Sequence, residues 1–457
     1  MKVKIFSISV FVIFILILIG LLIVRHKYLY EDKLTDKSKT VYIETTNQGF
    51  KLIRNGIPFY INGAAGDSYF KELAEIGGNT IRLYDTINLI NNLDTAAKYG
   101  LAVVVDIPIP RYYAQCYKNK QERKILISKV YNLVKNYKNH DALLLWNLGN
   151  EVYPRISSWK DFLKVSLREI QFLLTFNDLI NHIKKEDKNH PVSTSIDYIS
   201  MKQYAFYKIF SPKIDLLGYN NFGDIKSINE KIKKTSHSLI EFPYYISEFG
   251  SDGWWGNESK YTSWNSPIEQ TSINKVEQIG KRYNLIQNNN VNCLGSLLFF
   301  WGNKYECTYT WFSFFEDKYK SEILLEVQKL WSEFNCQPDF IGLDYMLVDG
   351  KGALDNIIFA PNELKVSELK FDNIDDDSLK IRWEICNDAW FNGWNEEKYN
   401  KKVLAPPKPI DCFLSIENDK ATFITPKEEG PYRIFAYVYD KRGYCATTNT
   451  PFYVLNP

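Results

Sequence analysis

The chain has 457 residues, with 56 Lys and Arg against 54 Asp and Glu, so its formal charge is +2. This balance lacks the basic excess of nucleic-acid-binding domains and gives no support to a nucleic-acid partner. A hydrophobic fraction of 45% and a charged fraction of 24% exclude a largely disordered chain and a multi-span membrane protein. Aromatic residues make up 15%, which indicates either aromatic core packing or a surface that stacks flat ligands such as sugar rings.

Residues 5–24 form an uncharged, mainly apolar run with basic residues on both sides. A helix of this length spans about 30 Å, the thickness of a bilayer core. No small-residue cleavage site follows the run, so the sequence predicts a transmembrane signal anchor rather than a cleaved signal peptide. Residues 25–45 are predicted to form a stalk.

The sequence contains no pattern for a bound metal or cofactor, and we expect neither. None of the seven cysteines lies in a CxxC pair, and the histidines lack metal-ligand spacing. The odd number of cysteines leaves at least one free thiol. One or two disulfides are compatible with export, and their connectivity stays open.

Residues 46–335 alternate short apolar runs with longer amphipathic stretches. Eight runs have the β-branched and aromatic composition of parallel strands that are buried on both faces. They cover residues 58–63, 79–84, 101–107, 143–148, 191–195, 214–220, 243–249 and 294–301. Helical spacing of apolar residues occurs between them, for example over residues 122–138 and 160–185. This alternation predicts an α/β fold, a (β/α)8 TIM barrel.

A doubly wound parallel sheet is the alternative to a barrel. Such a sheet normally carries a glycine-rich phosphate-binding turn after its first strand. The segment NGAAGD (62–67) at this place lacks the GxGxxG pattern. We therefore favour the barrel.

After residue 362 the pattern changes to short strands in which apolar and polar residues alternate, as in residues 378–385. Turn residues separate these strands up to the C-terminus. The pattern predicts an all-β, immunoglobulin-like sandwich over residues 362–457. Residues 336–361 are predicted to be a linker between the barrel and this sandwich.

Polar side chains collect at the carboxyl ends of the predicted barrel strands, where barrel active sites lie. Asn150 and Glu151 follow the fourth strand, and Glu248 lies at the end of the seventh. Two such carboxyl groups suit a retaining glycosidase, in which one protonates the leaving oxygen and the other attacks the anomeric carbon. Asp106, at the end of the third strand, is interpreted as a pocket residue or a loop anchor.

The segments around these glutamates resemble a known family. WNLGNE (146–151) and YYISEFG (244–250) are similar to the two catalytic signatures of the clan A glycoside hydrolases. Residues 50–335 as a whole resemble the catalytic TIM barrel of glycoside hydrolase family 2. Family 2 normally carries β-sandwich domains before the barrel, whereas here the predicted sandwich follows it.

The resemblance implies a role for each matching residue. Glu151 would be the acid/base and Glu248 the nucleophile, with a covalent glycosyl-enzyme between them. Asn150 would bind the 2-hydroxyl of the sugar. Arg82 would hold the nucleophile ionised through its charge, and Tyr219 would donate a hydrogen bond to it.

Tryptophans complete the predicted substrate-binding set. By the same resemblance, Trp301 on the eighth strand would form the floor under the bound sugar. Trp254, Trp255 and Trp264 follow the seventh strand in a long loop. They either stack on sugar or pack the loop against the barrel rim, and we include Trp254 and Trp255 in the predicted substrate site.

The sequence thus predicts a single-pass membrane protein with an extracytoplasmic catalytic domain, a retaining β-glycoside hydrolase that acts on an oligo- or polysaccharide. Two alternatives stay open. One is a β-glucan transglycosylase, similar to the glucanosyltransferases of the same clan. The other is a non-catalytic, membrane-anchored glycan-binding protein.

Overall fold

The computed structural model describes residues 37–156, 158, 160, 164–197, 200–223, 225, 242–256, 259–288, 292–332, 337–372, 379–388 and 406–456. The predicted anchor over residues 5–24 and the stalk up to residue 36 lie outside these ranges. Within them, no helix is both long enough and apolar enough to cross a bilayer.

The chain divides into two compact units. The first consists of Met1–Ala74, Asn79–Glu248 and Ile286–Leu297, and the second of Glu75–Gly78, Phe249–Leu285 and Leu298–Pro457. Each unit is built from segments that are distant in the sequence.

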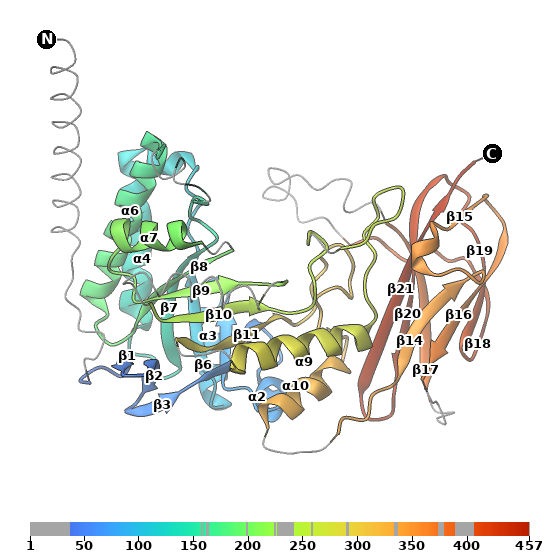
Figure 1. Cartoon of the computed structure of the whole chain (residues 1–457), viewed down its shortest axis with the longest axis horizontal. Coiled ribbons are helices and arrows are strands. Elements are labelled where there is room, and N and C mark those ends of the chain that lie inside the picture. Colours follow the sequence, from blue (N-terminus) through green and yellow to red (C-terminus); the bar gives the residue numbers. More distant parts are fainter. Residues whose placement is uncertain are drawn as a thin grey trace, which may run out of the picture. The chain divides into compact units, whose positions relative to one another are not determined.

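A closed barrel has the strand order β10-β11-β4-β5-β6-β7-β8-β9, and neighbours from β4 to β10 pair in parallel (Figure 1). Its strands are β4 (Ile61–Gly66), β5 (Thr80–Leu83), β6 (Ala102–Ile107), β7 (Leu143–Asn150), β8 (Val192–Ile196), β9 (Leu216–Asn220), β10 (Tyr244–Phe249) and β11 (Cys293–Trp301). The predicted TIM barrel is confirmed. The predicted strand over residues 58–63 is wrong. These residues include the end of one strand, Ile57–Phe59, and the start of the next, β4.

Helices follow most barrel strands, as expected for a chain that must return to start each parallel strand. They are α2 (Phe70–Glu75), α3 (Leu89–Lys98), α4 (Lys120–Tyr137), α6 (Leu167–Glu186), α7 (Met201–Phe210), α9 (Ser272–Asn288) and α10 (Ile323–Trp331). Two have strong N-terminal signals. Asn119 caps α4 by accepting from two backbone N–H groups, and Ser166 with Glu169 forms a capping box on α6.

A small antiparallel sheet closes the amino-terminal end of the barrel. It consists of β1 (Val41–Thr46), β2 (Gly49–Arg54) and β3 (Ile57–Phe59). Val41, Ile43 and Leu52 pack with barrel side chains such as Val104 and Leu216 in one apolar cluster. The stalk prediction is therefore wrong for its last residues, because the VYIETT segment forms a strand whose Val41 and Ile43 side chains pack in the barrel floor.

The C-terminal part consists of two packed sheets, one with the order β12-β13-β21-β20-β17 and the other β14-β16-β19-β18 (Figure 1). The strands are β12 (Phe315–Glu316), β13 (Tyr319–Ser321), β14 (Leu343–Val348), β15 (Ile358–Phe359), β16 (Leu364–Phe371), β17 (Lys380–Asn387), β18 (Phe413–Glu417), β19 (Lys420–Ile424), β20 (Gly430–Tyr439) and β21 (Tyr444–Val454). Trp383, Ile385, Phe423 and Phe452 lie in the shared core.

The predicted linker over residues 336–361 is wrong in part. Residues 343–348 form β14 and pair antiparallel with β16, so they belong to the sandwich. Leu343, Met346 and Val348 are buried in its core. The irregular spacing of these apolar residues comes from a register shift between Leu343 and Tyr345, which disguises the strand in the sequence.

Candidate active site

Glu151 lies at the carboxyl edge of the barrel, directly after β7. The register between β7 and β8 shifts just before it, and Gly149 has φ +77°, a conformation that favours glycine. A Cβ atom at Gly149 would lie 2.6 Å from a methyl group of Val152, so a side chain fits there only if Val152 moves. Glu151 has φ +54°, and its N–H donates to the carbonyl oxygen of Ser195 at 2.9 Å. These contacts fix the backbone from which the Glu151 side chain projects.

Glu248 lies at the same edge of the barrel, on β10, and is 6% exposed. Its Oε1 accepts hydrogen bonds from Arg82 Nη1 and from the Tyr84 hydroxyl, both at 3.0 Å. Burial and the charge of Glu248 raise the pKa of Tyr84, so this phenol stays a donor. An adjacent cation and two donors favour the ionised form of a carboxyl group.

Arg82 connects β5 to other strands through its guanidinium, which is fully buried. Its Nε and Nη2 donate to the two carboxylate oxygens of Asp106 at 2.9 and 2.7 Å, and Nη2 also donates to Asn150 Oδ1 at 2.9 Å. Burial opposes the charge, but the carboxylate of Asp106 and, to a smaller extent, that of Glu248 outweigh it and raise the pKa of Arg82 well above its usual value. Arg82 is therefore a permanent, rigidly held cation.

Asn220, at the end of β9, joins the two glutamates into one network. Its Nδ2 donates to Glu151 Oε1 at 2.8 Å and to Asn150 Oδ1 at 3.0 Å, while its Oδ1 accepts from Ser247 at 2.8 Å. Glu248 is therefore linked to Glu151 through Arg82, Asn150 and Asn220. This network places the two glutamates at one site and fixes the orientation of each amide between them.

A second polar layer supports the network inside the barrel. Asn147 Nδ2 donates to Asp106 Oδ1 at 2.8 Å, and Asn147 Oδ1 accepts from the hydroxyls of Ser193 and Ser195 at 2.8 and 3.2 Å. Tyr245 contributes a longer contact to the same oxygen at 3.4 Å. Fully paired polar layers of this kind hold a single arrangement of side chains. Asp106 therefore anchors Arg82, as a pocket residue rather than a reacting group.

Glu151 has a different environment from Glu248. Its side chain is 27% exposed, and Arg111 Nη2 lies 3.9 Å from Oε2. Burial raises the pKa of Glu151, and the charge of Asp197 adds to this, whereas Asn220, Arg111 and Arg155 oppose it. A raised pKa favours the protonated form of a carboxyl group, which is the form that donates a proton.

The structure brings together four predicted site residues: Arg82, Asn150, Glu151 and Glu248. The sequence reasoning missed the roles of Tyr84 and Asn220, although both lie at predicted strand ends. The alternation of side chains along a strand is the signal that identifies Asn220, because Gly218 already faces Ser195 and Ser247 inside the barrel.

The prediction that Tyr219 bonds to the nucleophile is wrong. Tyr219 is 1% exposed, and its ring packs 5.3 Å from that of Tyr244. Asn220 points into the barrel, so its neighbour Tyr219 points to the opposite face. The phenol that reaches Glu248 is that of Tyr84.

The predicted tryptophans differ in exposure. Trp301 is fully buried and packs on Phe315 at 5.1 Å, so its ring has no free face for a sugar, contrary to the prediction. Trp254 is 9% exposed and contacts the edge of Trp255. Trp255 is 47% exposed and packs on Phe312 at 5.5 Å. Only Trp255 among these three presents a large ring surface to solvent.

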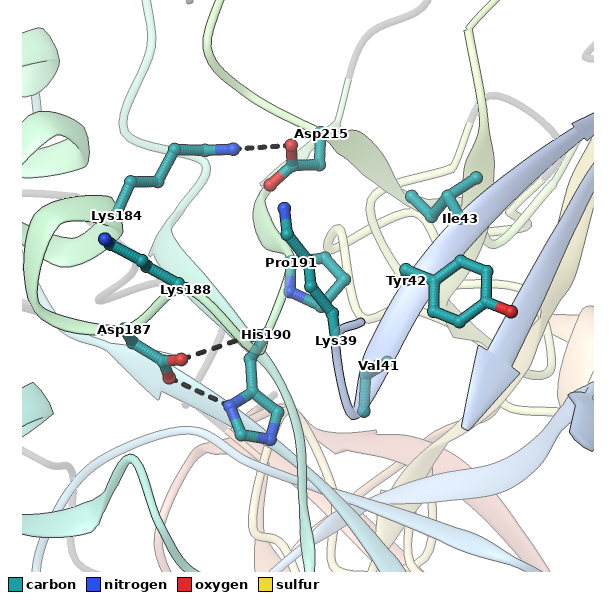
Figure 2. A pocket seen from close by; sticks show the side chains of 10 residues that line it. All are labelled: Lys39, Val41, Tyr42, Ile43, Lys184, Asp187, Lys188, His190, Pro191 and Asp215. Atoms are coloured by element: carbon teal, nitrogen blue, oxygen red, sulfur yellow. Dashed lines mark hydrogen bonds and ion pairs between the residues drawn. The ribbon is translucent and has the colours of Figure 1, made fainter. Parts of the chain in front are cut away.

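One pocket lies at the amino-terminal end of the barrel strands, opposite the edge that carries the glutamates. Residues that precede β8 and β9 line it together with β1, and its empty volume is about 360 Å³, open solvent included. Two polar pairs lie in it, with Lys184 Nζ 2.6 Å from Asp215 and His190 Nδ1 2.9 Å from Asp187 (Figure 2). This pocket therefore holds structural ion pairs and is not the candidate site.

In the part of the chain that the structure describes, no group of three or more His, Cys, Asp or Glu side chains could hold a metal ion. The candidate site contains one buried cation, two carboxyl groups with contrasting surroundings and several amides. Such a site can supply a proton and a nucleophilic or charge-stabilising carboxylate.

Comparison with solved structures finds similar folds at low identity. A β-glucuronidase 2 from Bacteroides uniformis is 13% identical, with a TM-score of 0.49, and the match covers 91% of this chain and 48% of that one. A putative β-galactosidase from Bacteroides fragilis is 13% identical (TM-score 0.48, 91% and 58% covered). An endo-β-1,4-mannanase from Thermotoga petrophila is 12% identical (TM-score 0.43, 88% and 99% covered). The chain thus spans about half the length of the first of these.

Comparison with curated proteins gave no match. Residues 73–296, which include most of the barrel and both glutamates, match the family model described as "Glycosyl hydrolases family 2, TIM barrel domain". The barrel of this chain is therefore similar to the TIM-barrel catalytic domain of glycoside hydrolase family 2, and its fold is that of the clan A glycoside hydrolases.

Proposed function

We propose that this chain is a retaining β-glycoside hydrolase that cleaves a β-linked glycan through a covalent glycosyl-enzyme intermediate. The observation that carries the proposal is the network Glu248–Arg82–Asn150–Asn220–Glu151, which holds two carboxyl groups in opposite electrostatic surroundings. A retaining mechanism needs one carboxylate and one carboxylic acid at the same sugar.

Glu248 is the nucleophile in this mechanism. The Arg82 cation and the Tyr84 hydroxyl both bind its Oε1 and support the ionised form. A carboxylate oxygen attacks the anomeric carbon, the bond from that carbon to the glycosidic oxygen breaks, and its electron pair goes to the leaving oxygen. Glu151 supplies the proton that this oxygen takes up.

Glu151 then becomes the base of the second step. A water molecule loses a proton to the Glu151 carboxylate and attacks the anomeric carbon, which releases Glu248 and restores both groups. The raised pKa of Glu151 suits the acid step, and the donors around it suit the carboxylate of the second step.

Asn150 binds the sugar hydroxyl next to the anomeric carbon. Its Oδ1 accepts from both Arg82 and Asn220. Within the described part of the chain, no group accepts from its Nδ2. The amide N–H₂ is therefore oriented for donation to a substrate hydroxyl, a contact that strengthens in the transition state.

The network Glu248–Arg82–Asn150–Asn220–Glu151 does not specify which sugar is bound. The similar proteins include glucuronidases, a galactosidase and a mannanase by their descriptions, so a β-linked sugar is the common factor. We propose an oligo- or polysaccharide as substrate, with Trp255 as the aromatic residue that contacts it. Membrane attachment through residues 5–24, an extracytoplasmic barrel and an immunoglobulin-like class for the sandwich are parts of the same proposal.

An activated aryl β-glycoside panel tests the function. Wild type should turn over at least one sugar, while Glu151→Gln and Glu248→Ala should lose about 10³-fold or more in kcat. Azide should restore turnover in Glu248→Ala with a product of inverted anomeric configuration, because azide replaces the missing nucleophile. No glutamate-dependent turnover of any sugar, together with glycan binding, would support the non-catalytic alternative.

Transglycosylation differs from hydrolysis only in the second step, in which a sugar hydroxyl replaces water. Mass spectrometry of products from a digested glycan array distinguishes the two. Products longer than the substrate would indicate transfer, and monosaccharides or short products alone would indicate hydrolysis.

A further inference from the structure

The outer oxygen of Glu151 faces a cation that the two-step mechanism does not use. Glu151 Oε1 is bound by Asn220 inside the network, whereas Oε2 lies 3.9 Å from Arg111 Nη2. Arg111 belongs to the loop between β6 and α4 and is 38% exposed at its side chain. The distance is that of an ion pair but is too long for a hydrogen bond. Glu151 therefore accepts no hydrogen bond from this Nη2 group.

The position of Arg111 relative to Glu151 is fixed by the backbone. The N–H of Tyr112 donates to the carbonyl oxygen of Val152 at 2.9 Å, which ties the loop to the residue after Glu151. Tyr112 also packs edge-on against Tyr113, with 5.3 Å between ring centroids, and Tyr113 is 38% exposed. A guanidinium and a partly exposed aromatic pair thus lie next to each other beside the acid.

The other charges near Glu151 balance each other. Arg155 Nε donates to Asp197 Oδ2 at 2.9 Å, and Nη2 contacts the same oxygen. Both side chains, together with Glu151, line a hollow whose empty volume is about 190 Å³, open solvent included. Asp197 thus pairs with Arg155, whereas Arg111 lies at ion-pair distance from Glu151 itself.

The acid of a glycosidase lies next to the oxygen that departs, so groups beyond its outer oxygen face the leaving group. We propose that the leaving-group side of this site binds an anionic substituent of the departing sugar, a carboxylate, sulfate or phosphate, through Arg111. Arginine suits this role because it presents five N–H donors in a planar fork that matches such anions. An anion can therefore bind to Arg111 in addition to the contacts that Arg111 already makes. The inference rests on the proposed function and specifies its substrate class.

An anion at this place would also assist the chemistry. Arg111 opposes the rise in the pKa of Glu151. A bound anion would neutralise Arg111 and so favour the protonated acid while the leaving group is present. Its departure would restore the effect of Arg111 and favour the carboxylate that the second step needs.

The test uses two β-glycosides that differ only in the charge of the leaving group: those of 4-hydroxybenzoate and of its methyl ester. Both carry the sugar that the aryl glycoside panel identifies. With the full chain at low salt, we expect kcat/KM for the acid to exceed that for the ester by about tenfold, mainly through KM. Because the contact is electrostatic, the ratio should fall as ionic strength rises.

Variants separate the role of Arg111 from a general effect. Arg111→Gln should lower the ratio about tenfold while changing kcat/KM for the ester by less than about threefold, since a charge-assisted contact contributes roughly this much. Arg111→Lys should keep most of the ratio. Lys118→Gln, in an exposed position of the same loop, should leave it unchanged.

Three outcomes are informative. The expected ratios support the inference. Turnover of both glycosides with no preference for the acid, or a preference that survives in Arg111→Gln, overturns the inference and leaves the proposed function standing. Turnover of neither glycoside, with every sugar, overturns the proposed function and the inference with it.

Discussion

Asn220 Nδ2 donates a hydrogen bond of 2.8 Å to Oε1 of Glu151, and the same nitrogen reaches Asn150 Oδ1 at 3.0 Å. One amide from β9 thus orients both residues at the end of β7. The bond lowers the pKa of Glu151 against the rise caused by burial. The strength of the acid is therefore set partly by a residue on another strand.

Asn220→Ala should raise the pKa of Glu151, because a donor to its carboxylate is lost. In a pH profile of kcat/KM, the limb on which the acid loses its proton should move to higher pH. The value at the optimum should fall about ten- to hundredfold, as expected for a lost hydrogen bond to a charged group. Asn91→Ala, in an exposed position of α3, is the matched control and should leave the profile unchanged. An unshifted limb in Asn220→Ala would show that Asn220 does not tune the acid.

Gly149→Ala should disturb catalysis through the backbone. Gly149 and Gly100 both have positive φ, +77° and +72°, so alanine strains each by about 1 kcal/mol. Only at Gly149 would the new Cβ also meet a neighbour, Val152 at 2.6 Å, whereas nothing lies within 4 Å at Gly100. We expect similar or moderately larger destabilisation for Gly149→Ala but a loss of about tenfold or more in kcat that Gly100→Ala does not show. Equal kcat values in the two variants would contradict this.

Arg82→Met should destabilise the fold strongly. It leaves the buried carboxylates of Asp106 and Glu248 without their cation, which costs about 3–5 kcal/mol for buried pairs. Urea unfolding at neutral pH measures the loss. Adding Asp106→Asn should recover part of it, because one uncompensated charge is removed. A double variant that is no more stable than Arg82→Met alone would argue against this account.

Glu322 should make stability depend on pH. It is fully buried, accepts hydrogen bonds from Ser272 and from the N–H of Ile341, and burial raises its pKa to about 7. A raised folded-state pKa means that the folded state binds more protons than the unfolded state. Stability from this group is therefore full below about pH 4.5 and is lost as pH rises through about 7.

Glu322→Gln should flatten this dependence. The difference in unfolding free energy between pH 5 and pH 8 should be smaller in the variant than in wild type, as urea unfolding at both values measures. Glu277→Gln, with an exposed side chain on α9, is the control and should keep the wild-type slope. A variant slope equal to that of wild type would show that Glu322 does not titrate in this range.

The barrel fold can be predicted from the sequence alone, because continuous apolar strands followed by amphipathic helices have few other stable arrangements. The sequence also predicts that Asn150, Glu151, Glu248 and Arg82 lie close together, since polar residues at the ends of apolar strands collect at one edge of a barrel. The strand β14 escaped detection because a register shift breaks its alternation. Its residues resemble a linker until they pair with β16.

Which side chains contact one another is known only from the folded chain. Tyr219 and Asn220 are adjacent in the sequence, yet the pleat of β9 sends one outward to Tyr244 and the other inward to Glu151. That Tyr84 is the phenol on Glu248 depends on the pairing of β5 with β6, which holds Arg82 against Asp106. Trp301 became a buried side chain because Phe315, from a later segment, covers it. Such contacts join residues far apart in the chain, so they cannot be predicted from local sequence patterns.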